Sequence, residues 1–68
     1  MENAAGVQLN AAQDELMGLY NGLARLLVER GEELAPFEER NALKALSALW
    51  QVANGLDMDP GQLYDLGA

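Results

Sequence analysis

Residues 9–26 read LNAAQDELMGLYNGLARL, and this stretch decides the fold. Apolar side chains recur in it at alternating steps of three and four residues. An α-helix turns once in about 3.6 residues, so such spacing lines side chains up along one narrow stripe of a helix. The pattern predicts a helix over about residues 8–30 that buries the following seam against another helix: Leu9, Ala12, Leu16, Leu19, Leu23 and Leu26.

Both ends of this helix carry residues that typically begin or end a helix. Asn3 and Asn10 are alternative N-caps, and Gln13 stands where it would complete a capping box with Asn10. Gly31 is the expected stop. The small and polar residues 1–7 in front of the helix are expected to fray.

A second helix is predicted over about residues 36–54. Pro36 suits the first helical turn, where its missing N–H costs nothing, and Gly55 is the expected stop. Leu56 is then placed to fold back on the last turn, as in a Schellman motif. Because the connection between the two helices is short, we expect them to be antiparallel neighbours.

The chain is therefore predicted to be one all-α domain, residues 1–68, built as an antiparallel two-helix hairpin. Asp59 as a cap and Pro60 behind it predict a short C-terminal helix or turn over about residues 59–66, which would cover the open end of the hairpin. No stretch predicts a strand, since isoleucine and threonine are absent and the valines are isolated.

The second helix is more apolar than a two-helix hairpin requires. One seam, which includes Leu46, Leu49 and Leu56, can face the first helix, whereas Leu43 and Trp50 belong to an adjacent seam. Because each helix of a hairpin buries only one stripe, a second stripe must be covered by something else. The favoured interpretation is a homodimer, in which a second copy completes a four-helix bundle. The alternatives are a different protein partner and the chain's own C-terminal segment.

Five residues are candidates for the partner-binding face, because they lie beside the main seams or carry large rings. Such rings often anchor interfaces, although Trp50 would equally fill the domain's own core. The five are Met17, Tyr20, Leu27, Leu43 and Trp50. Gly18 and Gly22, four residues apart in the first helix, are candidates for a close approach of another backbone.

The composition limits the classes of partner. Eleven acidic residues against four basic ones give a net charge of −7, which disfavours direct binding to nucleic acid or to anionic membranes. No apolar run approaches the roughly 18 residues of a membrane span, and the start lacks the pattern of a secretory signal. With no cysteine in the chain, a soluble cytoplasmic protein is expected.

No motif for catalysis, for a cofactor or for a metal is found. Ser47 is the single serine, and the chain has no histidine that could activate it. The aspartates from Asp57 onward do not match a calcium loop, because Gln62 stands at the glycine position and Ala68 at that of the final glutamate. The carboxylates at the hairpin tip are expected to form a solvated surface. We therefore predict no enzymatic activity, no cofactor and no catalytic or metal-binding residue.

The sequence predicts a small acidic protein-interaction module, an adaptor or regulator, that acts through an apolar helical face. Two other functions are alternatives. One is an acidic inhibitor of the phage or plasmid type, which would block a nucleic-acid-binding surface on its target. The other is a structural subunit of a larger complex.

Overall fold

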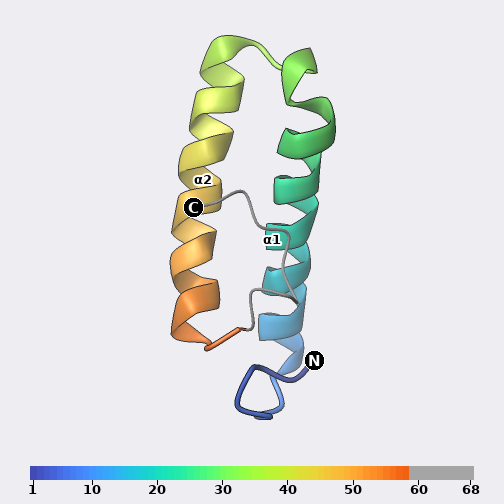
Figure 1. Ribbon diagram of the computed structural model, residues 1–68, viewed down its shortest axis with the longest axis vertical. Helices are drawn as coiled ribbons and strands as arrows, with labels where there is room; N and C mark the ends of the chain where they lie inside the picture. The colour runs from blue at the N-terminus through green and yellow to red at the C-terminus, as the bar shows by residue number, and fades with distance from the viewer. Residues whose placement is uncertain (59–68) are drawn as a thin grey trace.

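The computed structural model describes residues 1–58 of the 68-residue chain. Two α-helices, α1 (Ala11–Arg30) and α2 (Pro36–Gly55), run antiparallel side by side, and the 3₁₀ turn η1 (Gly31–Glu33) lies between them at the tip, as Figure 1 shows. This arrangement confirms the predicted all-helical hairpin. Within the described part of the chain, the β structure is one isolated bridge between Glu2 and Gln8. The predicted turn at residues 59–66 lies outside the described residues.

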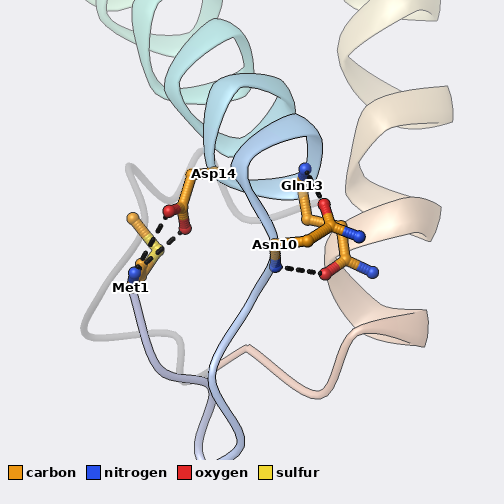
Figure 2. Close-up of polar contacts among 4 residues, drawn as sticks. All are labelled: Met1, Asn10, Gln13 and Asp14. Carbon is orange, nitrogen blue, oxygen red and sulfur yellow. Dashed lines mark hydrogen bonds and ion pairs between the residues drawn. The ribbon is translucent and has the colours of Figure 1, made fainter.

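The first helix begins with the capping box that its sequence indicates. The Gln13 backbone N–H donates to the Asn10 side chain at 2.8 Å, and the Asn10 backbone N–H donates to the Gln13 side chain at 2.9 Å (Figure 2). Asp14 adds negative charge in the first turn and lies 3.0 Å from the Met1 amine, in the ion pair that Figure 2 also shows. Of the two candidate caps it is therefore Asn10 that starts the helix, at Ala11 rather than at about residue 8.

The tip of the hairpin differs from the expected glycine stop. Gly31 has right-handed dihedral angles, φ −58° and ψ −30°, and leads the chain into η1. The Arg30 side chain donates two hydrogen bonds to Glu33 here, at 2.7 and 2.9 Å. This exposed pair lowers the pKa of the Glu33 carboxyl and raises the pKa of Arg30, because each charge favours the other. At the start of α2, the Glu38 side chain accepts a hydrogen bond from the Ala35 N–H at 2.7 Å.

The second helix ends in a Schellman motif that lies two residues later than predicted. Gly55 is still helical, and the left-handed residue is Asp57, with a φ of 58°. The Asp57 N–H donates to the Asn54 carbonyl and the Met58 N–H to the Ala53 carbonyl, each at 3.1 Å. Met58 and Ala53 also lie in the same buried apolar cluster, the side-chain contact that accompanies this motif. That contact gives a physical reason for the later end.

The residues in front of α1 form a loop with its own hydrogen bonds, whereas the sequence led us to expect a frayed end. The Asn3 side-chain oxygen accepts the backbone N–H groups of Ala5 and Val7 at 3.0 and 2.9 Å. Its side-chain nitrogen donates to the Leu56 carbonyl at 2.9 Å, just beyond the end of α2. Gly6, with a φ of 80°, allows the loop to turn back. The open end of the hairpin is therefore closed by the N-terminal loop.

Apolar side chains form two adjoining core clusters between the helices. Trp50, half-buried, packs against both clusters. The cluster near the open end holds Leu9, Met17, Ala53 and Met58, and the cluster nearer the tip holds Tyr20, Ala24 and Leu46.

The phase of the predicted seam in the first helix is wrong by about one residue. Leu19 is 60% exposed and Leu26 is 39% exposed, and Ala12 is exposed as well. The fully buried side chains of α1 are instead Met17, Tyr20 and Ala24. Of the predicted seam, Leu9 is buried, and Leu16 and Leu23 are half-buried at the edge of the core.

Candidate protein-binding face

The structure places four of the five predicted partner-binding residues against the hairpin's own core. Met17 is fully buried and Tyr20 is 2% exposed. Leu27 and Trp50 are half-buried and pack against the core clusters. Leu43 is 45% exposed. The five side chains do not come together as one exposed surface, and their role in binding stays a prediction.

A different set of apolar side chains lines one flank of α1. Each of these residues is a leucine that directly precedes a residue packed into the core. The pairs, with the core residue second, are Leu16 and Met17, Leu19 and Tyr20, Leu23 and Ala24, and Leu26 and Leu27. Neighbouring residues of a helix point about 100° apart, so the four leucines form a stripe beside the core.

The second helix repeats this pattern with smaller side chains. Ala45 precedes buried Leu46, and Val52 precedes buried Ala53. Leu49 in the same way precedes Trp50, which packs against both core clusters. These three residues form the corresponding stripe on α2.

The two stripes lie on the same side of the hairpin. Both helices are right-handed, and an approximate two-fold axis perpendicular to them relates antiparallel neighbours. A rotation about this axis exchanges the two helices but leaves each broad side of the hairpin in place. A residue that directly precedes a core residue of α1 therefore lies on the same side as a residue that directly precedes a core residue of α2. The resulting apolar surface, the leucine face, consists of Leu16, Leu19, Leu23, Leu26, Ala45, Leu49 and Val52.

The opposite side of the hairpin is mostly polar by the same geometry. It presents the residues that directly follow a core residue. Two aliphatic residues are exceptions: Val28 is 53% exposed, and Leu43, one helical turn before Ser47, is 45% exposed. The residues on this side are Gly18, Asn21, Arg25 and Val28 from α1, and Leu43, Ser47, Gln51 and Asn54 from α2.

Charged side chains are absent from the leucine face. Residues 16–26 contain a single charged residue, Arg25, which follows buried Ala24 and therefore lies on the polar side. Residues 45–52 contain none. A partner can therefore cover the leucine face without burying an unpaired charge of this chain, which would be costly. The charges gather instead at the tip, on Glu29, Arg30, Glu32, Glu33, Glu38, Glu39, Arg40 and Lys44, and at the open end.

The leucines of this face were predicted from the sequence as core residues, and Ala45 and Val52 were not predicted as part of a face. The signal that could have found them lies in the neighbours of each core residue. Along both helices, an apolar residue precedes the core residue, and the residue that follows is usually small or polar. That asymmetry predicts one apolar side and one polar side for any antiparallel pairing of the two helices.

The two glycines of α1 make no close backbone approach among the described residues. A Cβ atom added to Gly18 or Gly22 would meet no atom within 4 Å. Gly18 follows Met17 and lies on the polar side, away from the leucine face. The proposed close approach of another backbone at these glycines therefore has no counterpart within the hairpin.

Within residues 1–58, no group of three acidic side chains is close enough to hold a metal ion. Neither of the described helices is long and apolar enough to span a membrane.

No protein-family model matches the chain. A comparison with curated proteins and one with solved structures likewise found no significant match. What this chain does is therefore inferred from its leucine face and the distribution of its charges.

Proposed function

We propose that this chain is a small acidic interaction module, an adaptor or regulator without enzymatic activity, that binds protein through its leucine face. The asymmetry of the hairpin supports this function most directly. One side presents seven apolar residues with no charge among them, and Leu19, Leu26 and Val52 are 60, 39 and 37% exposed. An apolar surface of this kind is favourably removed from water by a matching surface. The proposed location is the cytoplasm, in keeping with the absence of cysteine.

The proposed partner is a second copy of the chain, which completes a four-helix bundle. A chain of 68 residues buries a smaller share of its surface than a larger domain does, so its stability alone is marginal. Disulfide support is excluded because the chain has no cysteine. Association of two copies removes the leucine faces from water and stabilises the folded state by mass action.

The molar mass in solution tests this proposal. We expect a mass near twice 7.3 kDa in light scattering at micromolar concentration. Leu19→Glu places a carboxylate in the leucine face, so it should return the chain to the monomer mass, because burying an unpaired charge is strongly unfavourable. Val28→Glu is the matched control: Val28 is 53% exposed but lies on the polar side, and the same change in charge there should leave the dimer intact.

Circular dichroism and a fluorescent hydrophobic dye separate loss of pairing from loss of fold. An equal fall in helicity in Leu19→Glu and Val28→Glu would show that the added glutamate weakens the hairpin itself, and not only the pairing of two copies. A monomeric wild-type chain whose dye binding is unchanged in Leu19→Glu would contradict any use of the leucine face. A monomer whose dye binding falls only in Leu19→Glu would contradict self-pairing and leave the face available to a different protein.

A further inference from the structure

We propose that in the paired molecule α1 of each copy lies over α2 of the other, with both hairpin tips at the same end of the bundle. This arrangement rests on the proposed pairing through the leucine face and specifies its geometry. Two identical faces can stack around a two-fold axis that runs either along the helices or across them. The first axis places α1 over the partner's α2, and the second places α1 over α1 and α2 over α2.

The two halves of the leucine face differ in side-chain size, and this difference selects the first arrangement. The α1 half consists of four leucines. The α2 half contains Ala45 and Val52 beside Leu49, and the exposed Ala48 lies next to them on the same helix. The α1 half is therefore a ridge, and the α2 half is a shallower surface.

Because of this difference in side-chain size, the spacing between packed helices favours α1 of one copy over α2 of the other. Packed helices lie about 8–10 Å apart, and the distance depends on the side chains between them. If ridge met ridge, leucines would hold the two α1 helices far apart and leave a gap between the small side chains of the two α2 helices. When the leucines of α1 in each copy pack on the smaller side chains of α2 in the other, the two α1–α2 contacts have the same helix spacing. The two hairpins can then pack without a void.

The levels of the residues along the hairpin agree with this packing. Met17 shares a core cluster with Ala53, and Ala24 shares one with Leu46. These pairs place Leu19 at about the level of residue 51, between Leu49 and Val52. An axis along the helices preserves these levels, so Leu19 of one copy comes beside Val52 of the other.

The leucine face lies on one of the two broad sides of the molecule. The molecule measures 39 × 20 × 17 Å, and the two helices lie side by side when it is viewed down the shortest axis (Figure 1). The leucine face thus belongs to one of the two broad sides, 39 by 20 Å in extent. Within that side, the face extends over residues 16–26 of α1 and 45–52 of α2, about 15 Å along the helices at 1.5 Å per residue.

Single cysteines introduced into the full-length chain test the arrangement, because the natural sequence has none. Leu19→Cys and Val52→Cys are mixed, oxidised and separated without reductant. Both positions are exposed in the hairpin, at 60 and 37%, so neither substitution opens the core. We expect about tenfold more disulfide-linked dimer from the mixture than from either variant alone, because pairing holds the two thiols at high effective concentration.

A second mixture distinguishes the opposite arrangement. Leu16→Cys with Leu26→Cys should stay largely unlinked, because the two α1 helices are then diagonal across the bundle, whereas an axis across the middle of the leucine face would bring these two positions together. If this mixture gave more disulfide-linked dimer than either variant alone, and the chain had the dimer mass in solution, α1 would lie over α1. That result would overturn the proposed arrangement but leave the self-pairing intact. A monomer mass with no linking beyond that of a Val28→Cys control would overturn both, which is the result expected if residues 59–68 or a different protein cover the face. As a second α1–α2 pair, Leu26→Cys with Ala45→Cys should also link.

Discussion

Asp57 has a backbone conformation that residues other than glycine rarely adopt. Its φ of 58° lies in the left-handed region, which costs an L-residue roughly 1–2 kcal/mol. The position follows the cap of α2 in the Schellman motif, where glycine is the usual residue. Aspartate is tolerated there better than most residues because its short polar side chain suits this region.

Asp57→Gly is expected to raise the free energy of unfolding by up to about 1 kcal/mol. The gain is the relief of backbone strain, reduced by the larger conformational entropy that glycine loses on folding. Urea unfolding at a fixed protein concentration measures it. Asp57→Ala is the control, because it removes the same carboxylate but keeps a Cβ atom. Equal stability of the glycine and alanine variants would show that the charge, and not the backbone, sets the effect.

The N-terminal loop acts as a structural element of its own, and it connects the two ends of the described chain. Beyond the three hydrogen bonds of the Asn3 side chain, the Ala4 N–H donates to the Asp57 carbonyl at 2.9 Å. The loop therefore donates hydrogen bonds to the carbonyl groups of the first two residues that follow α2, Leu56 and Asp57. Carbonyl groups at a helix end need such partners, because the helix itself supplies none.

Asn3→Ala is expected to lower the free energy of unfolding by about 1–3 kcal/mol, since it leaves the partly buried Leu56 carbonyl without this partner and removes two exposed hydrogen bonds of the loop. Amide hydrogen exchange should accelerate most at Ala5 and Val7, whose N–H groups the Asn3 side chain accepts. Gln8→Ala, in the same loop, is the control, because the Gln8 side chain is exposed. Unchanged exchange at Ala5 and Val7 in Asn3→Ala would contradict this role for the loop.

The helices themselves were predictable because their signals are local. The capping box of Asn10 and Gln13 and the proline at the first position of α2 act within one helical turn, so the sequence alone reveals them. The left-handed residue after α2 was predicted two residues early, at Gly55 rather than Asp57, because glycine is the stronger local signal. The buried contact between Met58 and Ala53, which depends on the packed hairpin, determines the actual end.

The rotation of α1 about its own axis could not be read from apolar spacing. Each turn of the helix carries two adjacent apolar residues, such as Leu19 and Tyr20 or Leu26 and Leu27. Either member of each pair gives steps of three and four residues, so both stripes satisfy the same helical period. Which stripe faces α2 depends on tertiary packing, and the structure buries Tyr20 while Leu19 stays exposed. The candidate face was thus visible as a pattern before it could be assigned to the outside.

At the scale of the whole molecule, the leucine face and the net charge act in opposite directions on pairing. Each copy carries a net charge of −7, so two copies repel each other. The apolar attraction acts at the uncharged middle of the hairpin, whereas the repulsion comes from its acidic ends. Salt screens the repulsion over a distance of roughly 10 Å at 0.1 M and 3 Å at 1 M, but it does not weaken apolar burial.

We therefore expect the dimer to become tighter as sodium chloride is raised, by about threefold to tenfold in dissociation constant between low and high salt. Sedimentation equilibrium over a range of protein concentrations measures this change. With both tips at the same end of the bundle, the carboxylates of Glu29 and Glu32 on the two copies contribute to the repulsion. Glu29→Gln combined with Glu32→Gln should tighten the dimer at low salt and flatten its dependence on salt.

The direction of the salt effect also distinguishes two modes of binding: attraction of the acidic ends to a cationic surface, and pairing through the leucine face. A chain whose acidic ends attract a cationic surface would lose affinity as salt increases, because screening then removes an attraction. A chain that pairs through its leucine face gains affinity, because screening removes only a repulsion. Dissociation of the dimer by salt would therefore contradict pairing through the leucine face. Tightening in the wild-type chain, reduced in the double glutamine variant and absent in monomeric Leu19→Glu, would assign the attraction to the middle of the hairpin and the repulsion to its tip.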